Sequence, residues 1–339
     1  MKLVIAIFKK LFYNKFKSAY IYFNLCFFSA ASHLYFEKGL ILLKLNENGR
    51  QRLNLYIFLS PWIIGLLVFT LYPIISSLFY SFTDYNIIDA PRFIGIRNYT
   101  DLMNDDLFFK SIKVTLYYTC LSVPVQLILS LALALLLNQK VPFMGFFRTS
   151  LYLPSMVSGV VMSLLWLWIF NSDFGLLNYL LSLAGIKGPM WLMDESWAIP
   201  ALILMSLWLT GSGMVVFLAA LQGVPVSLQE AAVLDGAGKW QQLRVITLPM
   251  ISPIILFQLI MGIIDSFQTF TQAVVMTRNG GPHYATYFYV FNLYTNAFKN
   301  YKIGYASALG WLLLVTVMLL TYLIFKLSDK YVYYEGGQN

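Results

Sequence analysis

Six long apolar stretches, separated by shorter polar segments, dominate the hydrophobic pattern of the chain. Each is at or above the roughly 20 residues that a helix needs to cross the hydrocarbon core of a bilayer. They cover roughly residues 55–80, 111–137, 149–170, 198–222, 249–277 and 304–328. Apolar runs such as 127–137 do not alternate at every second position, as the strands of a membrane barrel would. The pattern therefore predicts an all-α, polytopic membrane protein with six core transmembrane helices.

Prolines lie inside several of the predicted spans. In a soluble helix each would remove a backbone hydrogen bond and clash with the preceding turn. Within a membrane, neighbouring helices and local adjustments can satisfy the freed backbone groups. We therefore expect kinks rather than helix ends at Pro61, Pro73, Pro124, Pro154 and Pro253.

The composition agrees with burial in lipid. Hydrophobic residues make up 59% of the chain and charged residues 11%, whereas soluble domains carry about 25% charged residues. The formal net charge of +8 comes from basic residues scattered between apolar runs, without the clustered basic stripe that would indicate nucleic-acid binding. Cys26 and Cys120 lie in apolar stretches, so we expect two buried thiols rather than a disulfide framework.

Lysine and arginine are distributed unevenly between the segments that connect the spans. With both termini in the cytoplasm, the inside segments hold 15 Lys and Arg against 6 acidic residues, and the outside segments hold 8 of each. An excess of basic residues is typical of cytoplasmic loops. The inside segments are 1–54, 138–148, 223–248 and 326–339. The charge bias thus predicts a multi-pass protein with both termini cytoplasmic.

Residues 1–52 do not fit the six-span pattern and are predicted to form a basic, apolar N-terminal extension. A span there would place the five lysines of residues 1–17 outside, against the charge bias. The stretch also lacks the small-residue cleavage site of a signal peptide. We interpret it as an interfacial amphipathic segment or as an artefact of start-codon choice, with initiation near Leu43. The six-helix domain then covers 53–330, and a short cytoplasmic tail covers 331–339.

The outward loop at residues 171–197 contains closely spaced leucines between two glycines. Gly175 and Gly185 bracket Leu176, Leu177, Leu180, Leu181 and Leu183. A segment that is apolar but too short to span predicts a short helix lying on the membrane surface.

The inward segment 223–249 carries local signals for a helix, a turn and a second helix. Ser227 stands three residues before Glu230, which is the spacing of a capping box at a helix start. Gly236 can adopt a positive φ and end that helix, and the second helix would run to Pro249. A short cytoplasmic helix with small side chains suits docking into a groove on another protein. The alternative is an ordinary loop between two spans.

A longer motif extends over residues 230–253. It reads Glu-Ala-Ala-Val-Leu-Asp-Gly-Ala-Gly-Lys-Trp-Gln-Gln-Leu-Arg-Val-Ile-Thr-Leu-Pro-Met-Ile-Ser-Pro. The initial Glu-Ala-Ala, the glycine four residues later and the final Ile-x-Leu-Pro resemble the coupling-loop signature of bacterial ATP-binding-cassette import permeases. The resemblance covers about residues 53–337. Further motifs are similar to the oligosaccharide and glycerol-phosphate branch, namely Ser60-Pro-Trp62, Tyr72-Pro73, Ser81-Phe-Thr-Asp-Tyr85, Gly280-Gly-Pro282 and Tyr333-Tyr-Glu-Gly336.

This resemblance implies the permease subunit of a sugar importer in the bacterial plasma (inner) membrane, with an oligosaccharide as the expected solute. It implies three protein partners: a second homologous permease, an ATP-binding-cassette ATPase dimer, and an extracellular or periplasmic solute-binding protein. The residues that would couple the permease to the ATPase are Glu230, Ala231, Ala232, Asp235, Gly236, Ala237, Ile246, Leu248 and Pro249.

The sequence does not contain the nucleotide-binding motif of an ATPase. A phosphate-binding loop requires Gly-x-x-x-x-Gly-Lys followed by Ser or Thr. The nearest partial match to this motif, Gly236-Ala-Gly-Lys239, is followed by Trp240 and lacks the upstream glycine. We therefore expect the chain to be no enzyme and to bind no cofactor, with ATP and Mg²⁺ used by the partner ATPase.

Polar side chains inside the spans predict the path of the solute. Asp265 is the only acidic residue within a predicted span, and such residues usually face a cavity or a partner. On a continuous helix, Gln268, Thr269 and Gln272 would share its face. Neutral hydroxyl and amide groups suit sugars, together with an aromatic ring such as Phe267 for stacking. The alternative is that these groups hydrogen-bond neighbouring helices. The predicted pathway residues are Asp265, Ser266, Gln268, Thr269, Gln272, Ser206, Trp208 and Thr210.

Two other classes of function are open on the sequence alone. A secondary carrier or channel for a polar solute could use six spans and Asp265, but it would not need a docking helix at 230–249. A membrane-embedded enzyme would need clustered carboxylates or histidines at one membrane face. His33 and His283 are too few and too far apart along the chain for a metal site.

Overall fold

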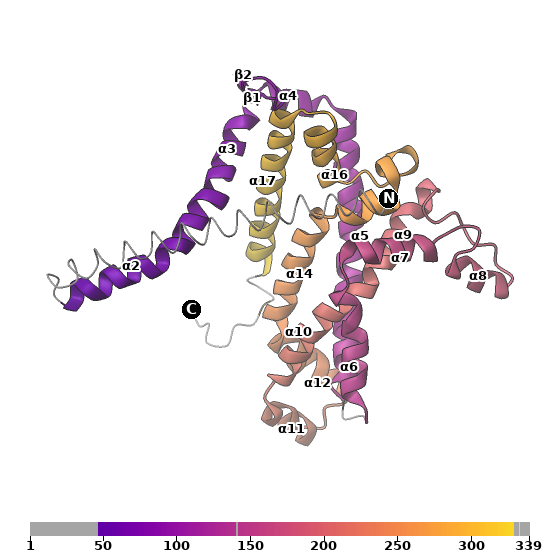
Figure 1. The fold of residues 1–339 in the computed structure, drawn as a ribbon. Helices are drawn as coiled ribbons and strands as arrows, with labels where there is room; N and C mark the ends of the chain where they lie inside the picture. The colour runs from indigo at the N-terminus through magenta and orange to yellow at the C-terminus, as the bar shows by residue number, and fades with distance from the viewer. Residues whose placement is uncertain (1–46, 140–141, 329–331, 333–339) are drawn as a thin grey trace, which may run out of the picture. The chain divides into compact units, whose positions relative to one another are not determined.

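A computed structural model describes residues 47–139, 142–328 and 332 of the chain (Figure 1). The predictions made for residues 1–46 and for most of the tail at 331–339 lie outside the described residues. The chain divides into two units, with the boundary between Ile75 and Ser76.

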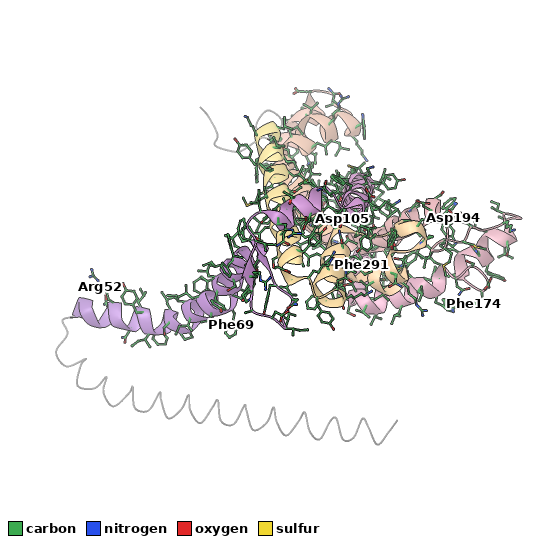
Figure 2. The ribbon with its side chains drawn as sticks, turned by 90° about the horizontal axis from the view of Figure 1, so that it is seen from above. Arg52, Phe69, Asp105, Phe174, Asp194 and Phe291 are labelled. Carbon is green, nitrogen blue, oxygen red and sulfur yellow. The ribbon has the colours of Figure 1, made fainter. Side chains whose placement is uncertain are left out.

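The first unit contains α2 (Glu47–Leu66) and a π-helical turn (Leu67–Leu71), and α3 (Tyr72–Ser81) begins in it. Pro61 lies within α2 without ending it. The π-helical turn ends two residues before Pro73, whose ring would otherwise clash with the carbonyl four residues earlier. Arg52 and Phe69 mark this unit in Figure 2. The continuous helix confirms the predicted first span, which covers Asn54–Ser81.

Four further spans belong to the second unit and agree with the predicted stretches. Two of them contain a short non-α turn: α9 is joined to α10 by a 3₁₀ turn at Trp208–Thr210, and α14 is followed by α15. Their bounds are α5 (Asp106–Leu137), α9 (Glu195–Leu207) with α10 (Gly211–Gln222), α14 (Ser252–Phe267) with α15 (Thr271–Met276), and α17 (Ile303–Ser328).

The third predicted span is not one helix. It consists of α6 (Met144–Tyr152) with a 3₁₀ turn (Leu153–Met156), followed by α7 (Gly159–Ile169), and the two halves are bent by 98°. The prediction that Pro154 only kinks its helix is therefore wrong. Val157 and Ser158 are extended, with ψ of 137° and 144°. The described residues thus contain five helices that could cross a membrane, or six if the bent pair counts as one span.

The 32-residue helix α5 forms the centre of the second unit and packs against α9, α10 and α14. Small polar side chains line its buried side, which allows these helices to approach closely. They are Ser111, Thr115, Thr119, Ser122 and Ser130. Cys120 lies on the same helix but is exposed, so the prediction of a buried thiol is wrong at this position. Helix α5 presents Cys120 on its opposite side.

A short helix between α15 and α17 packs against α5 and α17 in the second unit. Helix α16 (Tyr289–Tyr294), extended by a π-helical turn (Thr295–Lys299), starts where the backbone N–H of Tyr289 donates to Thr115 Oγ1 at 3.0 Å. The Tyr289 hydroxyl donates to the carbonyl oxygen of Leu309 on α17 at 2.9 Å. Burial raises the pKa of the Tyr289 phenol, which keeps it a neutral donor.

The loop before α16 turns at the predicted glycines. Gly280 and Gly281 have φ of 92° and 74°, and His283 is exposed, as expected for a loop residue.

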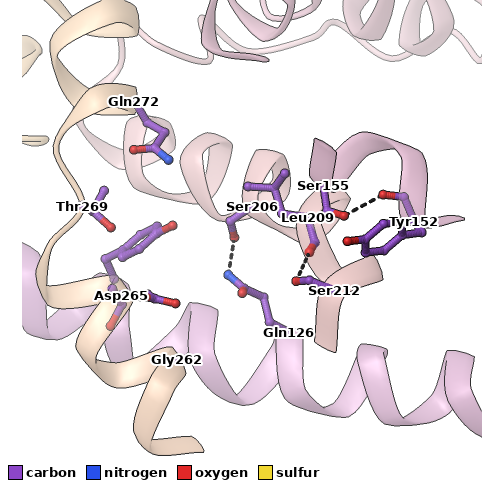
Figure 3. A pocket seen from close by; sticks show the side chains of 12 residues that line it. Gln126, Tyr152, Ser155, Ser206, Leu209, Ser212, Gly262, Asp265, Thr269 and Gln272 are labelled. Atoms are coloured by element: carbon purple, nitrogen blue, oxygen red, sulfur yellow. Dashed lines mark hydrogen bonds between the residues drawn. The ribbon is translucent and has the colours of Figure 1, made fainter. Parts of the chain in front are cut away.

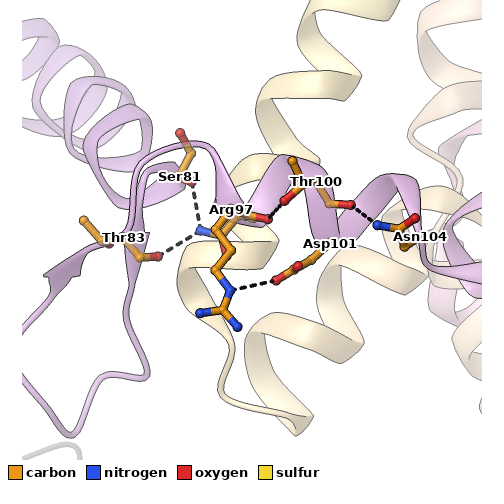
Figure 4. Close-up of polar contacts among 7 residues, drawn as sticks. Ser81, Thr83, Arg97, Thr100, Asp101 and Asn104 are labelled. Atoms are coloured by element: carbon orange, nitrogen blue, oxygen red, sulfur yellow. Dashed lines mark hydrogen bonds and ion pairs between the residues drawn. The ribbon is translucent and has the colours of Figure 1, made fainter.

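A small hairpin follows α3, with β1 (Thr83–Asp84) antiparallel to β2 (Arg92–Phe93). It is held by Asn98 of α4 (Arg97–Met103), which is 6% exposed. The Nδ2 group of Asn98 donates to the carbonyl oxygens of Ser81 and Thr83, both at 2.9 Å (Figure 4). These two bonds fix the chain where the first span ends.

Replacing Asn98 by Ala should destabilise the protein, because both carbonyl groups lose their donor in a buried position. We expect a loss of about 2–6 kcal/mol in the free energy of unfolding, at about 1–3 kcal/mol for each of the two buried groups left unpaired. Thermal unfolding in detergent would measure it. The control is Asn104→Ala, which removes an exposed bond from Asn104 Nδ2 to the Thr100 carbonyl at 2.9 Å and should change stability by less than about 0.5 kcal/mol. Equal unfolding temperatures for the two variants would contradict this role of Asn98.

Candidate functional site: the loop after α10 and a polar cavity

Helix α11 (Val226–Leu234) follows the fourth span and begins directly after Pro225. Pro225 itself occupies the N-cap position, with φ of −59° and ψ of 126°, and no side chain caps the helix. The predicted capping box of Ser227 and Glu230 is therefore wrong. The reason is local: the fixed φ of proline and its extended ψ start the helix before Ser227 is reached.

The predicted turn at Gly236 is confirmed. Gly236 has φ of 81°, its N–H donates to the Val233 carbonyl at 3.0 Å, and the N–H of Ala237 donates to the Ala232 carbonyl at 2.8 Å. This pair of bonds is a Schellman motif, which satisfies the free carbonyls at a helix end and requires a left-handed residue, most often glycine.

A second helical segment completes the predicted helix-turn-helix. It consists of α12 (Lys239–Gln242), a π-helical turn (Leu243–Thr247) and α13 (Leu248–Met250). The Gln242 side chain closes the turn by donating through Nε2 to the Ala237 carbonyl at 2.7 Å.

The signature residues of this loop divide into two groups. Ile246 and Leu248 pack against an apolar cluster that includes Phe217 of α10 and Ile251, so they attach the loop to the spans. Glu230, Ala231 and Asp235 are exposed on and beside α11, whereas Ala232 and Ala237 are half-buried. The first group fixes the loop, and the second presents a free surface.

Two exposed apolar residues of this loop were missed by the sequence prediction. The side chain of Leu234 is 88% exposed and that of Trp240 is 73% exposed. Large exposed apolar side chains in a polar loop indicate contact with another protein. Both residues could have been noticed in the sequence as large apolar residues within a polar segment.

A polar cavity of about 350 Å³ lies between α5, α9, α14 and the turns next to them (Figure 3). Hydroxyl and amide side chains dominate its wall. The predicted residues Ser206, Asp265, Ser266, Thr269 and Gln272 are brought together in it. The other lining residues are Tyr118, Gln126, Tyr152, Ser155, Leu209, Ser212 and Gly262.

A smaller cavity of about 110 Å³ shares Gln126, Ser212 and Asp265 with the first and adds Thr210. The carboxylate of Asp265 has no hydrogen bond or ion pair with another described residue, and none of the residues lining the two cavities is cationic.

The predicted single helical face does not exist, because α14 ends at Phe267 and α15 begins only at Thr271. Thr269 still reaches the cavity from the break, but Gln268 is exposed and lies outside both cavities. Trp208 also lies outside them and packs edge-to-face on Trp166, with ring centroids 5.2 Å apart. Phe267 is 5% exposed, so the aromatic rings at the cavity are tyrosines, Tyr118 and Tyr152.

Several cavity residues also hold the helices together. Gln126 Nε2 donates to Ser206 Oγ at 2.8 Å, and Ser266 Oγ donates to Thr119 Oγ1 at 2.9 Å. The predicted alternative of interhelical hydrogen bonding therefore applies to Ser206 and Ser266. Asp265 and Gln272 make no such bond among the described residues and face the cavity (Figure 3).

The sequence prediction missed the contributions of α5 and of the turn after α6. Gln126 could have been found, because an amide inside an apolar span is a signal of its own. Tyr152 and Ser155 carried no such signal, since only the 98° bend after them brings this turn to the cavity.

Comparison with known proteins places the chain in a family. Residues 108–332 match the model of the family described as "Binding-protein-dependent transport system inner membrane component". The chain is 42% identical over 287 residues to the probable ABC transporter permease protein YesP of Bacillus subtilis (strain 168), covering 84% of this chain and 93% of that protein. It is 32% identical over 279 residues to the arabinooligosaccharides transport system permease protein AraP of the same strain, covering 81% and 88%.

A solved structure is similar over the same region. The crystal structure of a bacterial alginate ABC transporter in complex with an alginate pentasaccharide-bound periplasmic protein matches with a TM-score of 0.74 and 25% identity, covering 83% of this chain and 96% of that one. The resemblance seen in the loop motif is confirmed, and so is the fold class. The chain belongs to the family of binding-protein-dependent transport system inner membrane components.

Proposed function

We propose that this chain is one of two permease subunits of an ATP-binding-cassette importer, and that it forms part of the path for a saccharide delivered by an external binding protein. The observation that carries the proposal is the exposed helix α11, ended by Gly236 and attached to the spans through Ile246 and Leu248. An exposed short helix on a fixed base suits docking into a cleft of a separate ATPase. ATP and Mg²⁺ would be used in that ATPase.

The coupling path follows from the packing of the loop. Ile246 and Leu248 contact the cluster that contains Met214 and Phe217 of α10, and α10 also carries Ser212 of the cavity wall. A displacement of α11 by an ATPase would thus act on a helix that lines the solute path, because a close-packed core transmits strain rather than absorbing it. The proposed coupling residues are those of the signature, together with Leu234 and Trp240.

The chemistry of the cavity supports a saccharide. Its wall offers serine, threonine and glutamine side chains and two tyrosine rings, and hydroxyl-rich solutes need several donors and acceptors with an aromatic surface. Two relatives are named for saccharides: AraP for arabinooligosaccharides, and AmyD of Thermoanaerobacterium thermosulfurigenes, 30% identical over 266 residues, for starch degradation products. Asp265, Thr269, Gln272 and Gln126 are the residues that we propose contact the solute.

The proposed orientation places the loop after α10 in the cytoplasm and the binding protein on the opposite side. The support is the charge bias, 15 Lys and Arg against 6 acidic residues on the inside segments. Both termini would then be cytoplasmic.

Gly236→Val should uncouple the transporter. The left-handed conformation costs about 1–2 kcal/mol for a residue with a Cβ, and more for a β-branched residue. Valine at this position would therefore open the Schellman motif. We expect less ATPase co-purifying with the permease, and ATP-dependent uptake reduced by about tenfold or more, the equivalent of 1.4 kcal/mol.

The matched control is Gly238→Ala in the same loop. Gly238 has φ of −71° and open space around its Cα, so alanine fits without strain. Unchanged uptake and ATPase association in Gly236→Val would refute the docking role of the loop.

Asp265→Asn should weaken uptake without affecting assembly. Hydrogen bonds to a charged group contribute about 1.5–3 kcal/mol, so the apparent KM for the solute should rise about 10- to 100-fold. The control is Gln268→Ala, which alters an exposed side chain outside both cavities. Uptake by proteoliposomes with the full complex measures both variants. Identical uptake kinetics for Asp265→Asn and Gln268→Ala would contradict a contact between Asp265 and the solute.

A further inference from the structure

The segment between α7 and α9, residues 170–194, forms a small folded unit that we call the outer arm. It contains α8 (Leu176–Leu183) and is organised around the half-buried amide of Asn178. Asn178 Nδ2 donates to the carbonyls of Ser172 at 3.0 Å and Pro189 at 3.3 Å, and Asn178 Oδ1 accepts from Trp191 Nε1 at 2.7 Å. These bonds join the two ends of the arm, so its outer surface has a fixed shape.

The inner face of the arm is apolar and is covered. Leu177 packs against the cluster that holds Phe170 and Leu192, and the rings of Phe170 and Trp191 lie 5.6 Å apart. These contacts attach α8 to the spans (Figure 2, near Phe174 and Asp194).

The outer face of the same helix is also apolar, and no described residue covers it. Leu176, Tyr179, Leu180 and Leu183 follow each other at helical spacing and are 43%, 60%, 51% and 68% exposed. Further exposed apolar side chains continue this face along the arm, namely Phe174, Ile186, Met190 and Met193. A helix that is apolar on both faces is typical of a nonaqueous environment.

The surface continues onto α7. Val161, Leu164, Leu165 and Trp168 are exposed on that helix. It is the second half of the bent pair, and the two halves together have the length and composition of a membrane segment. Charge is sparse in the arm, since residues 170–194 contain three charged side chains, Asp173, Lys187 and Asp194.

The composition of the face favours lipid over a protein partner. Protein interfaces are enriched in tyrosine, tryptophan and arginine, and leucine is under-represented among their most important contacts. Here leucine and isoleucine predominate on the face, the arm contains no arginine, and the exposed aromatic rings are Phe174 and Tyr179, as in the boundary layer of a membrane.

We propose that the outer face of the outer arm lies in the interfacial layer of the bilayer, in the leaflet opposite the loop after α10, with Leu180 and Leu183 among the lipid chains. The arm would fix the depth of α7 and α9, whose ends it joins. The proposal relies on the proposed function only for the choice of leaflet.

A site-specific fluorescent probe tests the proposal. Leu183→Cys, in a chain whose Cys26 and Cys120 are replaced by Ser, is labelled with an environment-sensitive dye. The full complex is then reconstituted in vesicles of phosphatidylethanolamine and phosphatidylglycerol. Lys187→Cys, exposed on the same arm, is the matched control. Nitroxide-labelled lipid should quench the probe at residue 183 about threefold more than at residue 187, as expected for insertion among lipid chains. Aqueous iodide should show the reverse order.

Two results would overturn the proposal. Equal access of iodide to residues 183 and 187 would place the face in water, and protection of residue 183 from both quenchers would mean that protein covers it. Leu180→Cys provides a second position should the first variant fail to assemble. ATP-dependent uptake by the same vesicles is measured separately, so failure of the transport function and failure of the lipid contact are distinguishable.

Discussion

Backbone N–H and C=O groups inside a bilayer must find partners within the protein, and this constraint organises the structure around its cavity. Three spans of the second unit are interrupted by a 3₁₀ or non-helical turn: after Tyr152, at Trp208–Thr210 and after Phe267. All three departures adjoin the same polar cavity, to which they contribute Ser155, Leu209 and Thr269. Broken helices are tolerated where they are buried in protein or line a cavity, which explains why the breaks occur together.

Serine hydroxyls satisfy the carbonyl groups at two of these breaks. Ser155 Oγ donates to the Tyr152 carbonyl at 2.6 Å, Ser212 Oγ to the Leu209 carbonyl at 3.3 Å and Ser130 Oγ to the Thr210 carbonyl at 3.1 Å. The same side chains therefore complete the backbone hydrogen bonding and contribute to the polar walls of the two cavities. Asp265 differs from them, because its carboxylate has no partner among the described residues and remains available to a solute.

The loop after α10 and the cavity are linked through packing rather than through polar contacts. Ile246 and Leu248 pack on the cluster along α10, and α10 also carries Ser212 at the cavity. A left-handed glycine at the tip and apolar anchors at the base make the loop rigid at both ends. Rigidity of this kind is what a docking element needs if a displacement is to reach the spans.

The sequence by itself determined the features that depend on neighbouring residues. Hydropathy gave the first, second, fourth, fifth and sixth spans, because about 20 apolar residues specify a spanning helix whatever surrounds them. The turn at Gly236 followed from one residue that accepts positive φ.

Only the tertiary structure decided the 98° bend after Tyr152, the break after Phe267 and the exposure of Cys120. It also decided that Gln126 and Tyr118 join Asp265 while Gln268 and Trp208 do not. These features depend on which helices pack together and on which side, and periodicity along one helix contains no information about its neighbours.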